Sequence, residues 1–300
     1  MDEKYLAEII AANTKLREES PMVGSITNTV SANFVANAQL ACGAKAAMVY
    51  LPDEAASLCK LAKSAYLNLG TLLPVYEKTV PAMLASCKEA GTPWVLDPVG
   101  IGIGELRAKL LAQIKNVPPA VVKGNASEII ALAAAWGLKA HRLKSSETSG
   151  SSKSTKKDVA VEAAATFSPE SASIVESRDT VADAKGAAVA IAKFTKGAVV
   201  ITGKIDAIVS EQAIIDIPGG SELQTKITGC GCALGGVIAA YCAVCEPFVA
   251  ALAASVHFKV SANLASNRSG APGTFYAEFI DALYYFDSEN LFNGRFDSLI

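Results

Sequence analysis

The chain has 300 residues, of which 51% are hydrophobic and 19% are charged, a composition too apolar for disorder and long enough for one or two packed domains. Its 27 basic and 29 acidic residues give a net charge of −2, which argues against nucleic-acid and membrane-surface binding because both need a concentrated basic face. Seven cysteines are an odd and sparse count, typical of a reducing compartment. We therefore expect a soluble cytoplasmic protein.

The predicted elements alternate along the chain. The first is an amphipathic helix, because Leu6, Ile9, Ile10 and Leu16 share one helical face behind an acidic start, unlike a secretion signal. Short apolar runs predict strands at 46–51, 65–69, 94–97, 120–123, 198–202, 207–210 and 213–217. Helical patterns follow at 28–41, 53–63, 75–90, 105–115, 126–136, 180–195, 230–245, 248–266 and 276–286.

This alternation predicts an α/β fold. Crossover connections imply a mostly parallel sheet with helices on both faces, and the last two strands are expected to form an edge hairpin. We expect a single domain over 1–300 with a solvated Ser/Lys-rich insertion at about 139–158, although a phosphorylated or nucleic-acid-binding segment is an alternative. The longest run that is both uncharged and predominantly apolar, 229–245, is shorter than the ~20 apolar residues that span a bilayer.

Polar residues follow several predicted strands at their carboxyl ends, where ligands bind in open parallel sheets. Asp97 ends one strand, Lys123 another and Thr202 a third, while Asn125 and Glu128 lie just beyond Lys123. If these ends meet at one edge of the sheet, they supply two carboxylates, a cation and a hydroxyl group to one site.

A glycine-rich loop opens the apolar helix predicted at 230–245. Gly229 and Gly231 flank Cys230 and would let backbone N–H groups point inward at a positively polarised helix start, which makes an anion cradle. A tight loop that serves only helix packing explains the glycines equally well. No Walker motif is present around Gly203-Lys204, because Ala198 stands where that motif needs its first glycine.

Asp97 and Glu128 each allow two interpretations. Asp97 precedes a proline, a common turn device, and Asn125 with Glu128 has the spacing of a helix capping box. The functional alternative is a magnesium site, because Mg²⁺ takes one or two carboxylates together with water and phosphate oxygens.

The cysteines do not form a zinc site in this interpretation. A helix over 232–245 would separate Cys232 from Cys242 by about 15 Å, too far for one tetrahedral ion. Five cysteines are expected to pack in the core and Cys230 to lie in the loop: the five are Cys42, Cys59, Cys87, Cys242 and Cys245. Cys232 differs because the helix start should favour its thiolate.

Taken together, five motifs give the chain a resemblance to the hydroxyethylthiazole kinase family of the ribokinase-like superfamily. They are ITNTVSANFVANAQLACGA (26–44), LDPVGIG (96–102), KGNASEI (123–129), VITGKID (200–206) and TKITGCGCALGGVIAA (225–240). The resemblance implies a ribokinase-like α/β/α fold and ATP-dependent, magnesium-assisted phosphorylation of the hydroxyl of 4-methyl-5-(2-hydroxyethyl)thiazole for thiamine salvage. It also implies a homotrimer with sites near subunit boundaries.

The resemblance also implies roles for individual residues. Cys232 occupies the position of the catalytic aspartate of ribokinase-like sugar kinases, beside the attacking hydroxyl. The loop Gly229, Cys230 and Gly231 would hold the transferring phosphoryl group. The other matching positions are Met48, Gly229 and Asn28 for the thiazole, Lys123, Thr202 and Asn125 for the nucleotide, and Asp97 and Glu128 for the metal and phosphates.

Two departures from the family pattern and two alternative functions remain. Bacterial members commonly carry arginine where Lys123 stands, and the segment 138–178 is longer than usual. A pyridoxal or hydroxymethylpyrimidine kinase is the nearest alternative, but such an enzyme should carry aspartate in place of Cys232. A non-catalytic ligand-binding homologue is the alternative of another class.

Overall fold

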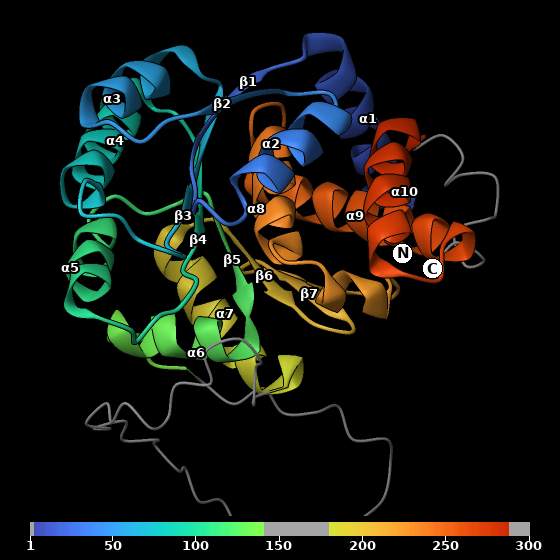
Figure 1. Ribbon diagram of the computed structural model, residues 1–300. Coiled ribbons are helices and arrows are strands. Elements are labelled where there is room, and N and C mark those ends of the chain that lie inside the picture. Colours follow the sequence, from blue (N-terminus) through green and yellow to red (C-terminus); the bar gives the residue numbers. More distant parts are fainter. Residues whose placement is uncertain (1–2, 141–179, 288–300) are drawn as a thin grey trace, which may run out of the picture.

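An eight-stranded sheet crosses the computed structural model, which describes residues 3–140 and 180–287 (Figure 1). The strands follow the order β2-β1-β3-β4-β5-β6-β7-β8. Their bounds are β1 (Met22–Ile26), β2 (Lys45–Met48), β3 (Ser64–Asn68), β4 (Trp94–Asp97), β5 (Val121–Asn125), β6 (Ala198–Thr202), β7 (Asp206–Val209) and β8 (Ile214–Ile217). The strands from β2 to β6 pair in parallel, and β7 and β8 add an antiparallel edge hairpin, as predicted.

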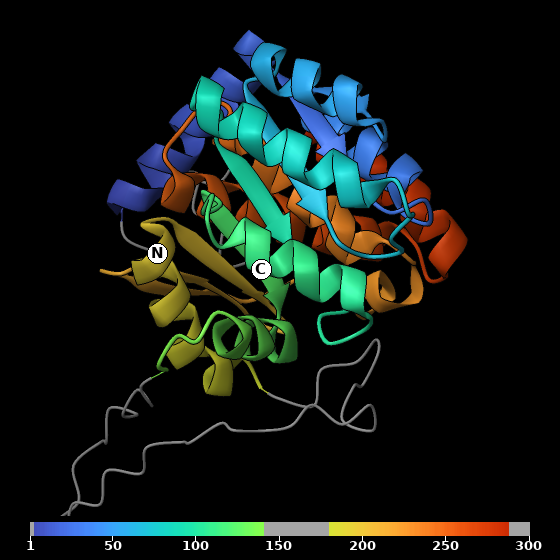
Figure 2. The ribbon, with the colours of Figure 1, turned by 90° about the vertical axis from the view of Figure 1, so that its left-hand side faces the viewer.

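Helices cover both faces of the sheet. Their bounds are α1 (Glu3–Glu19), α2 (Ala32–Ala41), α3 (Pro52–Leu61), α4 (Tyr76–Ala90), α5 (Glu105–Ile114), α6 (Ala126–Ala135), α7 (Val181–Thr195), η2 (Glu222–Lys226), α8 (Cys230–Cys242), α9 (Pro247–Arg268) and α10 (Pro272–Tyr285). Figure 2 looks onto the layer of α3 to α7, and α1, α2, α8, α9 and α10 lie on the opposite face. The predicted α/β/α architecture is therefore confirmed.

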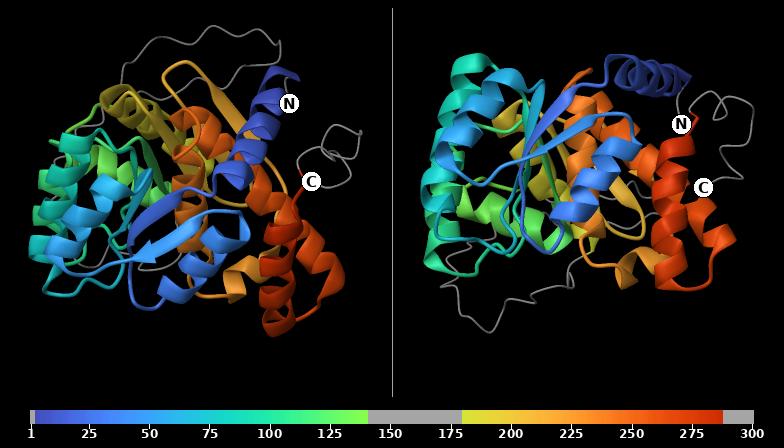
Figure 3. Two further views of the ribbon diagram at one scale, coloured as in Figure 1. Left: turned by 90° about the horizontal axis from the view of Figure 1, so that it is seen from above. Right: turned by 45° about the horizontal axis from the view of Figure 1, so that its top comes forward.

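Two hydrophobic cores lie on either side of the sheet. Tyr66 of β3 joins the core beneath α8, whereas its neighbours Ala65 and Leu67 join the core beneath α3 to α7. Successive side chains of a strand point to opposite faces, so a strand buried on both faces reads as a continuous apolar run. Figure 3 shows α10 packed outside α9 and α2, away from the sheet.

The sequence patterns missed strand β1, which lies between β2 and β3. Gly24 and Ser25 interrupt its apolar run, because other side chains lie close to both faces of the strand at these positions. A Cβ at Gly24 would come within 2.9 Å of Leu58, and Ser25 exchanges hydrogen bonds with the buried amide of Gln39. The helix predicted at 28–41 begins later, at Ala32, because the preceding residues form the loop after β1.

The longest helix runs through the interior. Among the described residues, α9 alone is long and apolar enough to cross a membrane, and 78% of its apolar window is buried inside the protein, as in a core helix. The insertion predicted at about 139–158 lies, apart from its first two residues, outside the described ranges.

Candidate active site

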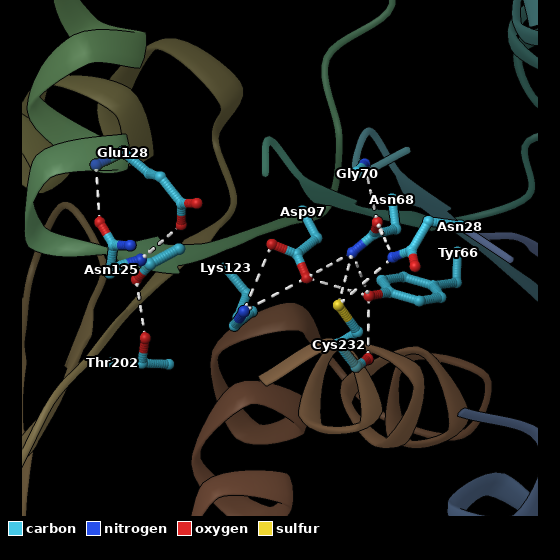
Figure 4. A network of polar contacts seen from close by, with 11 residues as sticks. Asn28, Tyr66, Asn68, Gly70, Asp97, Lys123, Asn125, Glu128, Thr202 and Cys232 are labelled. Carbon is cyan, nitrogen blue, oxygen red and sulfur yellow. Dashed lines mark hydrogen bonds and ion pairs between the residues drawn. The ribbon is translucent and has the colours of Figure 1, made fainter. Parts of the chain in front are cut away.

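The carboxyl ends of four neighbouring strands meet the start of α8 (Figure 4). Asn68, Asp97, Asn125 and Thr202 are the last residues of β3, β4, β5 and β6. Cys232 lies in the first turn of α8, facing the ends of β3 and β4. The predicted edge of the sheet therefore does bring together residues from distant motifs.

A buried ion pair lies at the centre of this site. The Nζ atom of Lys123 is 3.2 Å from Oδ2 of Asp97, and the two side chains are 5% and 0% exposed. Burial raises the pKa of Asp97, which Lys123 and the N–H and O–H donors of Asn68 and Tyr66 partly oppose. Burial alone would lower the pKa of Lys123, but the carboxylates of Asp97 and Glu128 outweigh it and raise that pKa. The lysine therefore stays charged.

Glu128 is part of a helix cap. Its Oε2 accepts a 2.9 Å hydrogen bond from the Asn125 backbone N–H, and its own N–H donates to Asn125 Oδ1 at 2.9 Å. The predicted capping box is thus confirmed, and it holds Glu128 at the start of α6. Burial and the negative charge of Asp97 raise the pKa of Glu128. A nearby cation would relieve this electrostatic cost.

The two carboxylates differ in their fit to a magnesium ion. Both oxygens of Asp97 lie within 3.3 Å of Lys123 Nζ, and the side chain has no exposed surface. Glu128 is half-buried as a residue, and its Oε2 accepts the hydrogen bond from the Asn125 backbone N–H. The described residues contain no group of three His, Cys, Asp or Glu side chains that could hold a metal ion. These residues fit a cation that is held largely by phosphate oxygens and water.

Two amide groups surround the thiol of Cys232. Its Sγ accepts hydrogen bonds from Asn68 Nδ2 at 3.2 Å and from Asn28 Nδ2 at 3.6 Å, and its carbonyl oxygen accepts one from the Tyr66 hydroxyl at 2.9 Å. Asn28 follows β1 and also caps its own loop through the N–H groups of Val30 and Ser31. The thiol is therefore fixed by side chains from two other elements.

The predicted stabilisation of the Cys232 thiolate is wrong. Burial and the neighbouring Asp97 carboxylate raise the pKa of this thiol, and Lys123 offsets only part of the effect. Cys230, predicted to lie in the loop, is instead the buried first residue of α8, and burial raises its pKa to about 12. Desolvation disfavours the charged form and here outweighs the helix end.

The glycine loop makes a tight start to α8. Gly229 is the N-cap of α8 with φ 82°, and a Cβ there would lie 2.7 Å from the Cβ of Ser31. A Cβ at Gly231 would lie 3.2 Å from Lys123 Nζ. The absence of side chains therefore brings the Lys123 ammonium group against the helix start, where free N–H groups and a fixed positive charge can hold one anion.

The remaining predicted residues flank this centre. Thr202 pairs with Asn125 across β5 and β6, and its hydroxyl donates to the Gly124 carbonyl at 3.3 Å. Met48 ends β2, an edge strand separated from β3 by β1, and packs half-buried against the α2–α8 core. Along the sheet, Thr202 and Asn125 therefore lie on one side of the Cys232–Lys123 centre, and Met48 lies on the other.

Tyr66 and Asn68 were missed by the sequence analysis. Both belong to β3, which lies outside the five motifs. Asparagine is uncommon in strands, so Asn68 at the end of an apolar run is the signal that could have revealed them.

Comparison with solved structures shows that this fold is similar to that of ribokinase-like proteins. A ribokinase-like superfamily protein of Enterococcus faecalis matches with a TM-score of 0.57 over 94% of each chain at 13% identity, a likeness of fold. The structure of the Pyrococcus horikoshii hydroxyethylthiazole kinase matches with a TM-score of 0.76 at 28% identity, covering 94% of this chain and 95% of that one.

Sequence comparison identifies the family. The model of the hydroxyethylthiazole kinase family matches residues 14–168 and 169–289. Curated proteins named hydroxyethylthiazole kinase are 42% identical in Bifidobacterium adolescentis, over 93% of this chain and 90% of the relative, and 40% identical in Bifidobacterium longum subsp. infantis, over 94% and 88%. The chain belongs to the hydroxyethylthiazole kinase family.

Proposed function

We propose that this protein transfers the γ-phosphoryl group of ATP to the hydroxyl of 4-methyl-5-(2-hydroxyethyl)thiazole, and so forms the thiazole phosphate for thiamine salvage. Membership of the hydroxyethylthiazole kinase family supports this function. The observation in the structure that carries it is the position of Cys232 in the first turn of α8, beside a helix start that holds Lys123 against Gly231.

The phosphoryl group would be held by the start of α8. Backbone N–H groups after Gly229 and the ammonium of Lys123 offer hydrogen bonds and positive charge to its equatorial oxygens. Phosphoryl transfer needs mainly such positioning and charge neutralisation, since its transition state is loose. Asp97 keeps Lys123 charged and oriented through the 3.2 Å ion pair.

The acceptor hydroxyl would lie beside Cys232. The oxygen of the acceptor hydroxyl attacks the γ-phosphorus. The bond from that phosphorus to the β,γ-bridging oxygen breaks, and ADP leaves. The hydroxyl proton passes towards Cys232 Sγ when that sulfur is ionised. Because the pKa of this thiol is raised, the ionised fraction is small at neutral pH. We assign the thiazole ring to the side of the site that carries Asn28, Met48 and Gly229.

The nucleotide would occupy the opposite side. Asn125 ends β5, Thr202 ends β6, and Lys123 lies two residues before the end of β5 on this side of the centre. Glu128 would hold Mg²⁺ together with phosphate oxygens and water, and the buried Asp97, paired with Lys123, would add negative charge near the metal without touching it. The metal would supply neutralisation of the phosphate charge.

The assembly and location of the enzyme are also part of the proposal. We infer a homotrimer with its sites near subunit boundaries, a cytoplasmic location and a single kinase domain over 1–300. The resemblance to the family supports the trimer, and the near-zero net charge agrees with a site built from backbone N–H groups rather than from a basic surface.

An ATP-dependent phosphorylation assay tests this function. The thiazole alcohol, pyridoxal and hydroxymethylpyrimidine are offered side by side with ATP and Mg²⁺, and product is measured by mass spectrometry. We expect phosphorylation of the thiazole alcohol with the highest kcat/KM. Reaction of either alternative without reaction of the thiazole would assign the enzyme to another vitamin-precursor kinase class, and no reaction with any would favour a binding protein.

A further inference from the structure

We propose that Asn68 is a positioning residue for this kinase, whose carboxamide fixes the Cys232 thiol beside the Asp97 carboxylate. The inference rests on the proposed function, in which Cys232 lies against the attacking hydroxyl. It concerns a residue on β3 that no motif singled out. Figure 4 shows its amide between the Cys232 sulfur, Asp97 and Asn28.

The amide of Asn68 is held in a single orientation. Its Oδ1 accepts two hydrogen bonds of 2.9 Å, from Asn28 Nδ2 and from the Gly70 backbone N–H. These donors occupy both lone pairs of that oxygen. The Nδ2 group must then face the other way, where Asp97 Oδ2 accepts at 2.8 Å and Cys232 Sγ at 3.2 Å. Rotating the amide by 180° would set its oxygen against the carboxylate.

The loop after β3 holds this arrangement from behind. A Cβ at Gly70 would lie 2.7 Å from Asn28 Nδ2 and 2.9 Å from Asn68 Oδ1, so only glycine allows the backbone N–H to approach the amides. Arg107 of α5 binds the same loop, donating to the Gly70 carbonyl at 2.6 Å and to the Leu69 carbonyl at 2.9 Å. A chain of hydrogen bonds thus runs from α5 to the thiol.

Asn68 acts through Cys232 rather than on the substrate. Its side chain is 0% exposed, whereas Cys232 is only partly buried and lies at the open end of the strands. A residue without exposed surface cannot touch the acceptor alcohol. Asn68 can, however, set where the sulfur lies, and small displacements of a reacting group reduce turnover strongly.

A double-mutant cycle tests this assignment. Asn68→Leu keeps the side-chain volume and removes the amide, so we expect kcat to fall by about 10-fold with KM for ATP nearly unchanged. In the Cys232→Ala background the same substitution should lower kcat by less than about 2-fold, because the group it positions is gone. Equal losses in both backgrounds, or a loss confined to KM for ATP, would overturn the inference.

Gly70→Ala provides a second variant if Asn68→Leu folds poorly. It adds one methyl group and leaves the chemical identity of every site side chain unchanged, yet it should reproduce the kcat loss because the new Cβ displaces the Asn68 amide. Gly273→Ala is the matched control, because a Cβ there meets nothing within 4 Å, and its kcat should equal that of the wild type. Wild-type kcat in Gly70→Ala would count against the positioning role.

Alkylation of Cys232 gives a readout that needs no kinase activity. Iodoacetamide labelling of the folded protein at one fixed pH is followed by mass spectrometry of the Cys232 peptide. Asn68→Leu should slow labelling by about 5-fold, because the sulfur loses a donor at equal packing volume. If the thiazole assay fails but labelling slows, only the proposed function is wrong. If turnover is normal and labelling is unchanged, the inference about Asn68 is wrong.

Discussion

The ammonium group of Lys123 and the carboxylate of Asp97 are 3.2 Å apart, with the two side chains 5% and 0% exposed. The lysine comes from β5 and the aspartate ends β4, so neighbouring parallel strands supply the pair. Gly231 of α8 lies against the same ammonium group. One buried cation thus connects the sheet to the proposed phosphoryl cradle, and its properties can be measured separately for stability and for catalysis.

Lys123→Met should reduce both the stability of the folded protein and its rate of catalysis. Removing one partner leaves Asp97 buried and uncompensated, which should lower the free energy of unfolding by about 3 kcal/mol in urea titrations. Loss of the cation at the phosphoryl group should lower kcat by about 100-fold. Adding Asp97→Asn should restore stability but not turnover. Restored turnover in that double variant would contradict the role given to Lys123.

Cys232 is expected to respond to substitution by aspartate and alanine in opposite ways. Cys232→Asp should retain or improve kcat, because a carboxylate is ionised over a wider pH range than this thiol. Cys232→Ala should lower kcat by about 100-fold, the usual contribution of a positioned base. Steady-state assays with the thiazole alcohol measure both variants. An alanine variant as fast as the wild type would remove Cys232 from the mechanism.

The pH dependence of kcat should report the thiol. Burial and Asp97 raise the pKa of Cys232, so the ionised fraction increases with pH throughout the range below that pKa. The wild-type kcat should therefore rise between pH 6 and about 8.5, the ordinary thiol pKa, without a plateau. Cys232→Asp should have a flatter profile over the same range. A wild-type profile that is flat there would show that no proton is transferred to this sulfur before or during the rate-limiting step.

Gly229→Ala should damage the cradle. The left-handed φ of 82° and the 2.7 Å approach of a new Cβ to Ser31 both oppose the substitution. Gly91→Ala separates the two effects, because Gly91 has φ 68° and open space for a Cβ. We expect Gly91→Ala to lose about 1 kcal/mol of unfolding free energy, with normal kcat. Gly229→Ala should lose more and lower kcat as well, and equal stability losses would show that the contact with Ser31 relaxes without cost.

His257 should make the protein sensitive to acid. It is completely buried between Tyr241 and the Leu283 carbonyl, and burial lowers its pKa to about 3. Between that pKa and about 6.5 the unfolded chain binds a proton that the folded protein does not, so stability falls as pH falls, by up to about 1.4 kcal/mol per pH unit. His257→Gln, whose amide N–H can donate to the Leu283 carbonyl and which has no titratable group, should lack this contribution in urea titrations between pH 7 and 5. Identical slopes for the two proteins would refute it.

The sequence patterns predicted much of the fold because the relevant signals are local. The strand at 94–97 and the strand at 198–202 have the predicted bounds, and the Asn125–Glu128 capping box needs only a spacing of three residues. Strand β1 was missed because its Gly24 and Ser25 suit contacts with α3 and α2 that no local pattern contains. The two residues that interrupt the apolar run of β1 are the same residues that make these tertiary contacts.

By itself the sequence determined the α/β class, the glycine loop and the set of polar residues that end the strands. Which of these residues touch was decided by the tertiary structure, because Asn68 and Cys232 are 164 positions apart and meet only when β3 packs beneath α8. The same packing reversed the expected direction of the Cys232 pKa. A helix start is visible in a sequence, but desolvation and a neighbouring carboxylate depend on what the folded chain places around the sulfur.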